Sequence, residues 1–191
     1  AGESMDVVAN PTLARDLITD PALNVNNQNN PNLSAGMTFV GQFLDHDITF
    51  DPTSSLERQS DPESIQNFRT PLFELDSVYW SGPGASPHLY DQSTEGEGIK
   101  FHIEEIPGAV AVSAGGFPRF DLPRNNQGTA LLGDPRNDEN LIVSQLHLAM
   151  LKFHNAVVDY VKAEFELTNP EEVFTEAQRL VRWHYQWIII H

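Results

Sequence analysis

The sequence contains no cysteine, and this single absence removes several kinds of chemistry. Disulfide bridges, thiolate nucleophiles and metals ligated by cysteine are all excluded. A metal bound by this chain must therefore use histidine, carboxylate or carbonyl ligands.

Basic residues are also scarce. The chain has 11 Lys and Arg residues against 27 Asp and Glu residues, which gives a formal net charge of −16 at pH 7. Binding to nucleic acid requires clustered Lys and Arg side chains that neutralise phosphates. We therefore expect no nucleic-acid partner.

Long apolar runs are lacking as well. The longest near the end of the chain is 187–190, and no basic stretch followed by an apolar one opens the chain. A membrane-spanning helix needs about 20 predominantly apolar residues, so we expect no membrane span. With 191 residues, of which 40% are hydrophobic, the chain has room for one domain with a real core.

The chain has two regions of different composition. Residues 1–33 are rich in Asn and Pro and lack periodicity, which predicts an extended arm. Residues 34–191 carry the helical patterns. Ser34 is a candidate N-cap for a short helix that would hold Asp45 and His46 near its C-terminal turn.

Residues 51–135 hold many Pro and Gly residues, so we expect loops, a few short strands and turns there. A long helix is predicted over about 138–163, capped by Asn137 or Asp138. The order Asn-Pro-Glu-Glu at 169–172 supplies a cap, a first-turn Pro and first-turn acids for a last helix. That helix has no stop signal, so we expect the chain to be part of something longer.

The most informative segment is 41–47, which sets His46 between Asp45 and Asp47 inside an apolar stretch. Unpaired charge is expensive in such surroundings. The cost of burying the charges of an acid-His-acid cluster is offset by a bound metal or by ionic partners, or is accepted because the cluster transfers protons. Each of these outcomes is functional. The alternative is a helix end with a satisfied core histidine and two solvated aspartates.

A second motif lies at 133–139, which reads Gly-Asp-x-Arg-x-x-Glu, and a His-Asn pair follows at His154 and Asn155. Together with Gln-x-x-Asp-His-Asp at 42–47, the motifs resemble the animal-type haem peroxidases of the peroxidase-cyclooxygenase superfamily. The resemblance covers about 34–191, and the lack of cysteine favours a bacterial-type member without disulfides. It implies a mainly α fold, with a helical core, long loops and few short strands.

The resemblance implies roles for three residues. His46 matches the family's distal histidine, which moves a proton between the two oxygens of a peroxide. Arg136 matches its catalytic arginine, whose fixed charge stabilises the leaving oxygen. Gln42 matches the residue that orients distal water and lies at the halide site in halide-oxidising members. Taken alone, Arg136 could instead form a surface salt bridge to Asp134 or Asp138.

Asp45 and Glu139 match the carboxylates that form ester bonds to haem methyl groups in the mammalian members. The implied cofactor is therefore haem b, covalently linked through these two acids. Members with a third, sulfonium link have a Met after the glutamate, whereas this chain has Asn140. The resemblance thus disfavours chloride oxidation and favours bromide, iodide, thiocyanate or phenolic donors. Asp45 could otherwise be a helix-end carboxylate that faces solvent.

The segment 67–79 resembles the family's calcium loop, and oxygen ligands suit this hard cation. The implied ligands come from alternating positions of the loop and from the distal helix: Asp47, Thr70, Leu72 through its carbonyl, Glu74 and Asp76. Glu74 and Asp76 depart from the usual Asp and Ser. The alternating pattern could also be an ordinary half-exposed strand.

The implied enzyme reduces hydrogen peroxide through an oxo-ferryl intermediate and oxidises halides, pseudohalides or small organic donors. The family's proximal histidine, with its own signature, has no match in this chain. We therefore expect a distal half that is completed by the C-terminal half of the same peroxidase. The compartment stays open, with a secreted or periplasmic location favoured.

Two other functions remain open. A lipid oxygenase of the same superfamily, a cyclooxygenase or fatty-acid dioxygenase, would share His46 and the calcium loop, but the Asp45 and Glu139 pair favours the peroxidase branch. A non-haem metal-dependent hydrolase would need a His-x-x-x-His or comparable spacing, which the chain lacks. His147 and His154 share one helix face, and we expect them to pack and hydrogen-bond rather than to bind a metal.

Overall fold

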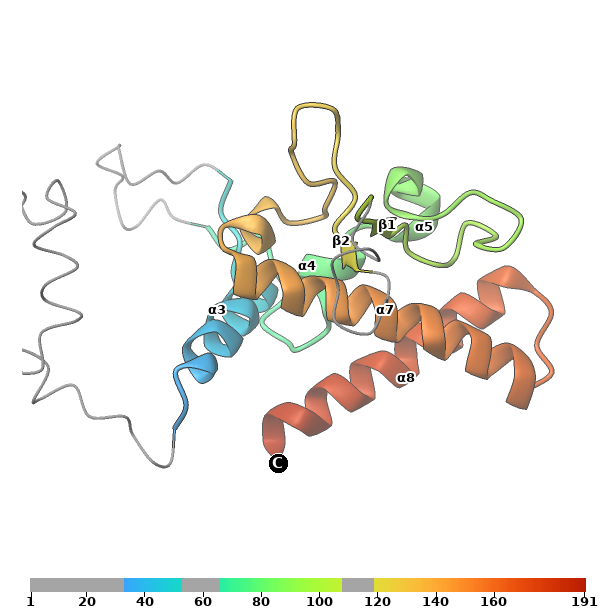
Figure 1. Cartoon of the computed structure of the whole chain (residues 1–191). Coiled ribbons are helices and arrows are strands. Elements are labelled where there is room, and N and C mark those ends of the chain that lie inside the picture. Colours follow the sequence, from blue (N-terminus) through green and yellow to red (C-terminus); the bar gives the residue numbers. More distant parts are fainter. Residues whose placement is uncertain (1–32, 53–65, 108–118) are drawn as a thin grey trace, which may run out of the picture. The chain divides into compact units, whose positions relative to one another are not determined.

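The computed structural model describes residues 33–52, 66–107 and 119–191 (Figure 1). The chain divides into two units, residues 1–38 and 39–191, and every candidate site residue belongs to the second unit. The extended arm predicted for residues 1–33 lies outside the described residues, apart from its last position.

Helix α3 (Gly36–Ile48) carries Asp45 and His46 near its C-terminal end, so this prediction is confirmed. Its first turn starts from the Ser34 carbonyl, which accepts a backbone hydrogen bond of 3.0 Å. The helix buries Phe43, His46 and Asp47. Because side chains three and four positions apart share a helix face, the polar pair enters the protein together with the phenylalanine.

Two long helices, α7 (Leu141–Glu164) and α8 (Pro170–Ile190), pack against each other (Figure 1). The side chain of Asn169 accepts a backbone hydrogen bond of 2.9 Å from the first turn of α8, and Pro170 occupies that turn, as predicted. Asn140 caps α7 in the same way, at 3.0 Å.

The cap of α7 predicted at Asn137 or Asp138 is wrong, because both residues belong to a separate 3-10 turn, η3 (Pro135–Asp138). The side chain of Asp134 caps this turn by accepting a hydrogen bond from the backbone N–H of Arg136 at 3.0 Å. The turn therefore places Arg136 and Asn137 ahead of the long helix instead of inside it.

Between the two motifs, the described part of the chain forms short elements, as predicted for 51–135. The helical ones are α4 (Asp76–Tyr79), α5 (Gly82–Ala85) and the 3-10 turn η2 (Pro87–Leu89). The strands β1 (Glu104–Glu105) and β2 (Phe120–Asp121) pair in antiparallel orientation. The predicted mainly helical fold with few short strands is confirmed.

Aromatic rings surround His154 in the core. The ring centroids of Tyr79, Phe101 and Phe174 lie 5.3, 5.0 and 5.5 Å from that of His154. The Tyr79 hydroxyl donates to Nδ1 of His154 at 3.0 Å, and Nε2 donates to the Ile99 carbonyl at 2.9 Å. Burial lowers the pKa of His154 to about 4, so the ring is neutral. Its predicted packing and hydrogen-bonding role is confirmed.

Helix α7 is also long and apolar enough to cross a membrane, judged by length and composition alone. Core helices of other proteins meet the same criterion, so this is weak evidence for a span. Its buried positions include Ser144, His147 and His154, whose polar atoms bond to other parts of the described chain or of the helix. This pattern is typical of a helix packed inside protein.

Candidate active site

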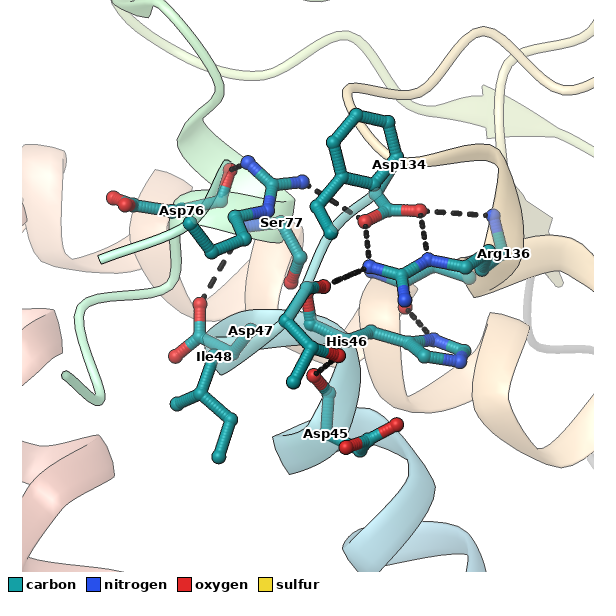
Figure 2. A network of polar contacts seen from close by, with 12 residues as sticks. Asp45, His46, Asp47, Ile48, Asp76, Ser77, Asp134 and Arg136 are labelled. Carbon is teal, nitrogen blue, oxygen red and sulfur yellow. Dashed lines mark hydrogen bonds and ion pairs between the residues drawn. The ribbon is translucent and has the colours of Figure 1, made fainter. Parts of the chain in front are cut away.

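The C-terminal end of α3 lies against η3, and contacts between them join the two sequence motifs (Figure 2). Nη2 of Arg136 donates to the backbone carbonyl of His46 at 3.1 Å. The side chain of Asn137 bonds to the imidazole of His46 at 2.8 Å. Two consecutive residues of the turn therefore hold the same histidine, one by its backbone and one by its ring.

The His46 imidazole has one engaged and one open nitrogen. The residue is only 4% exposed. Its Nδ1 faces Oδ1 of Asn137, an atom that can only accept, so Nδ1 carries the proton. Nε2 makes no hydrogen bond with the described residues. With this placement of the proton, Nε2 keeps a lone pair that can act as a base.

The guanidinium of Arg136 is likewise held on one side and open on the other. Nε donates to Asp134 at 3.0 Å, and Nη2 donates to Asp134 at 2.7 Å and to the carbonyls of His46 and Thr49. These carbonyls lie at the end of α3, where a positive charge is favourable. Nη1 has no hydrogen bond within the described residues, so it is free to donate to a ligand.

Asp134 is fully buried and binds two arginines, since Nη2 of Arg69 also donates to it, at 2.8 Å. Burial alone would raise the pKa of Asp134, but the hydrogen bonds from Arg136 and Arg69 outweigh it and lower the pKa below its usual value. The carboxylate is therefore charged at neutral pH. The salt bridge considered as an alternative role for Arg136 does form with Asp134, although the carboxylate is buried and only the arginine is partly exposed.

Gln42 links α3 to the beginning of α7. Its Nε2 donates to Oε2 of Glu139 at 2.9 Å, and its Oε1 accepts from Asn140 at 3.1 Å. Gln42 lies one helical turn before His46, so both side chains share a face of α3. The structure thus brings Gln42, His46, Arg136 and Glu139 to one region.

Asp45 and Glu139 are both exposed. The side chain of Asp45 has no hydrogen bond within the described residues, which matches the alternative of a solvent-facing carboxylate at a helix end. The same exposure leaves both acids accessible to a cofactor that covers this face.

Asp47 points into the protein and binds the beginning of α4. Its Oδ2 accepts from the backbone N–H of Leu75 at 3.0 Å and its Oδ1 from that of Ser77 at 3.4 Å. Burial raises the pKa of Asp47, against the smaller opposite effect of these hydrogen bonds. Leu75 has a left-handed backbone with φ 59°, a conformation that costs about 1–3 kcal/mol outside glycine. Asp47 therefore anchors α3 to a strained position.

The other predicted calcium ligands differ in exposure and in their partners. Residues 66–75 form bends and irregular chain, which excludes the half-exposed strand considered for them. Thr70 and Leu72 are exposed, and Oδ1 of Asp76 lies 3.6 Å from Nη2 of Arg182. Within the described residues, no group of three His, Asp or Glu side chains is arranged to hold a metal ion. The calcium site stays a prediction.

Sequence reasoning missed three features of the site. They are the bond of Asn137 to His46, the binding of two arginines by Asp134, and Arg69 as the second of these arginines. Asn137 follows the motif arginine directly, and its bond to His46 spans 91 positions of sequence. Arg69 reaches Asp134 across 65 positions. The one available signal was the concentration of polar residues at 134–140, which is unusual between apolar segments.

A comparison with protein families gives a match to part of the chain. Residues 110–191 match the sequence model of the family described as animal haem peroxidase. Over these residues, the match agrees with the family resemblance that the motifs suggested. The matched region includes Arg136, Glu139, α7 and α8, whereas α3 with His46 lies before it. No curated protein matches the chain.

Proposed function

We propose that this chain forms the distal side of a haem peroxidase, which reduces hydrogen peroxide and oxidises halides, pseudohalides or small organic donors. The observation that supports this most is the pair of open groups, Nε2 of His46 and Nη1 of Arg136, on two segments that bind each other. Heterolytic cleavage of a peroxide requires a base and a fixed positive charge from the protein.

The residues present fit a haem. The open nitrogen of His46 and the open edge of Arg136 would face the peroxide, and the exposed carboxylates of Asp45 and Glu139 would hold the porphyrin. Bound haem would supply the two-electron reduction of peroxide and the oxidation of the donor. We propose that the C-terminal half of the same peroxidase would supply the histidine that holds the iron.

His46 would move the proton. Because Nδ1 is engaged by Asn137, Nε2 accepts the proton of hydrogen peroxide and returns it to the leaving oxygen, which departs as water. Arg136 would stabilise the negative charge on that oxygen through Nη1, since a guanidinium stays charged at every physiological pH. Asp134 fixes the guanidinium in place for this role.

Gln42 would orient water or a small anion beside His46. Both ends of its amide are engaged, by Glu139 and Asn140, so its position is fixed. Glu139 therefore has two proposed roles, as a partner of Gln42 and as a site of attachment for the cofactor.

The proposed attachments are two esters, one of Asp45 and one of Glu139, each with a haem methyl group. One carboxylic acid, one methyl C–H and one hydrogen peroxide give one ester and two water molecules, so peroxide is the oxidant and no further reactant is needed. The exposure of both acids supports this, because a buried carboxylate could not reach the cofactor.

We also propose that calcium binds beside Asp47. Two observations support a cation there. The Asp47 carboxylate is fully buried, and the hydroxyl of Ser77 is buried without a hydrogen-bond partner in the described chain. Thr70, Leu72 through its carbonyl, Glu74 and Asp76 would supply the remaining ligands.

The main alternative is a fatty-acid oxygenase of the same superfamily. The test is to combine the chain with its proposed proximal half, add haem, and assay two reactions side by side. Peroxide-dependent oxidation of bromide or a phenol supports the peroxidase. Oxygen uptake with a fatty acid, without peroxide-dependent donor oxidation, would assign the lipid oxygenase, and the lack of a Soret band would reject both.

A further inference from the structure

A buried chain of three polar side chains runs from the site into the protein. Asn137 is fully buried and bonds to His46 on one side and to His147 on the other. Its Oδ1 lies 2.8 Å from Nδ1 of His46, and its Nδ2 lies 2.9 Å from Nδ1 of His147. The exposed fractions of the two histidines are 4% and 1%.

Each bond in this chain has a direction. An amide oxygen only accepts and an amide nitrogen only donates. His46 therefore carries its proton on Nδ1, and His147 accepts at Nδ1 and carries its proton on Nε2. A reversed amide would reverse both, and it would put the His46 proton on Nε2, where a base needs a lone pair.

His147 is suited to hold the amide in this direction. Burial lowers the pKa of His147 to about 4, so the ring is neutral at physiological pH and able to accept. Its ring packs edge-on against Phe43 of α3, with centroids 6.5 Å apart and planes at 81°. The ring is thus held by α7 on one side and contacts the helix that carries His46 on the other.

We propose that Asn137 is a positioning residue that fixes the tautomer and the ring orientation of His46, and that His147 fixes the direction of the Asn137 amide. This inference rests on the proposed function, in which Nε2 of His46 moves the proton of the peroxide. Neither Asn137 nor His147 touches a substrate; they act through His46.

The direct test is nitrogen NMR on the full chain with ¹⁵N-labelled histidine, without haem. Nitrogen shifts and couplings to ring protons distinguish the two tautomers, and His46→Gln and His147→Gln assign the signals. We expect the proton on Nδ1 of His46 and on Nε2 of His147. A proton on Nε2 of His46 in the neutral ring overturns the proposal.

Two substitutions at Asn137 separate positioning from packing. Asn137→Asp keeps an acceptor for His46 and removes the donor to His147, so His46 should keep its tautomer while His147 moves its proton to Nδ1. Asn137→Leu removes both bonds and should give His46 a mixture of tautomers. Unchanged His46 signals in Asn137→Leu would contradict the proposal. If Asn137→Leu does not fold, the shift of His147 in Asn137→Asp remains the deciding result.

The haem-loaded enzyme supplies the second readout. Loss of a residue that orients a functional histidine typically costs about ten- to a hundredfold in activity. We expect Asn137→Leu to slow the reaction with peroxide by this factor, Asn137→Asp to restore most of it, and the KM for the reducing donor to stay unchanged. The control is Asn155→Leu, because the side chain of Asn155 bonds only to the backbone of Phe101 and to neither histidine.

The two readouts keep this inference distinct from the proposed function. The expected tautomers without any reaction with peroxide would reject the peroxidase and leave the role of Asn137 intact. A normal peroxidase with the His46 proton on Nε2, or with full activity in Asn137→Leu, would reject the role of Asn137 alone.

Discussion

Asp134 binds Arg136 through three hydrogen bonds, from the backbone N–H at 3.0 Å, from Nε at 3.0 Å and from Nη2 at 2.7 Å. The same carboxylate that caps η3 therefore also aims the guanidinium. Because the arginine in turn binds the last carbonyls of α3, Asp134 controls how the two motifs meet.

Replacing this carboxylate should destabilise the protein. Breaking one partner of a buried ion pair costs about 3–5 kcal/mol, and we expect Asp134→Asn to fall near the lower value because Arg136 is partly exposed. Urea unfolding followed by circular dichroism measures the loss. The matched control is Asp121→Asn, whose ion pair with Arg124 is partly exposed at both ends and should contribute less than about 1 kcal/mol. Equal losses in the two variants would contradict the role of Asp134.

The same pair makes a prediction about pH. The pKa of Asp134 is lowered in the folded state, so its contribution to stability is fully present above the unfolded value of 3.8 and is lost as the pH falls through the folded value. The stability difference between the wild type and Asp134→Asn should therefore be constant from about pH 5 to 8 and shrink in stronger acid. A difference that grows on acidification would show that the pKa is raised.

Gly133 should not tolerate a side chain. A Cβ at this position would lie 2.7 Å from Cβ of Trp80 and 3.3 Å from the carbonyl oxygen of Ser77. Neither atom is the end of a flexible side chain, so Gly133→Ala should cost about 1–3 kcal/mol through overpacking. Gly84→Ala is the control, because a Cβ there meets no atom within 4 Å. An unchanged unfolding temperature in Gly133→Ala would mean that the backbone at this point shifts easily.

If haem is attached covalently through Asp45 and Glu139, the number of ester links should fall stepwise as the two acids are replaced. After treatment of the haem-loaded protein with hydrogen peroxide, acidified organic solvent should no longer extract the haem. Asp45→Ala and Glu139→Ala should each keep one ester, and the double variant should release all of its haem. Complete extraction from the wild type would show that these acids serve only as polar neighbours of the cofactor, and it would favour the lipid-oxygenase branch.

Calcium should bind the protein and raise its stability. We expect bound calcium by elemental analysis after dialysis against calcium-free buffer, and a higher unfolding temperature on adding calcium, as binding to the folded state requires. Asp47→Asn should abolish both effects, whereas Asp159→Asn, on the exposed side of α7, should keep them. A calcium-free protein with an unchanged unfolding temperature would contradict the site.

Local sequence signals predicted the helices well. α8 has Asn169 and Pro170 at its beginning, and α3 follows the apolar spacing around Phe43, so both could be placed from spacing and caps. The beginning of α7 could not, because Asn137, Asp138 and Asn140 are all acceptable caps. Tertiary contacts of Asn137 decided among them.

In the site, too, some features could be predicted from the sequence and others could not. The motif residues His46, Arg136 and Gln42 could be named because their order in the chain resembles a family. Their orientation depends on contacts between segments far apart in the sequence, such as Asn137 with His147 and Arg69 with Asp134. Such contacts leave no local pattern, so the sequence could not predict which atom of His46 is open.

The measurement that tests the central claim most directly is the rate at which the haem-loaded protein reacts with hydrogen peroxide, followed by stopped-flow absorbance in the Soret region. His46→Gln should lower this rate by about a hundredfold or more, the usual contribution of a positioned acid-base group. His184→Gln, which alters an exposed histidine on α8 outside the site, should leave the rate unchanged. A rate in His46→Gln equal to that of His184→Gln would remove His46 from the reaction and contradict the account.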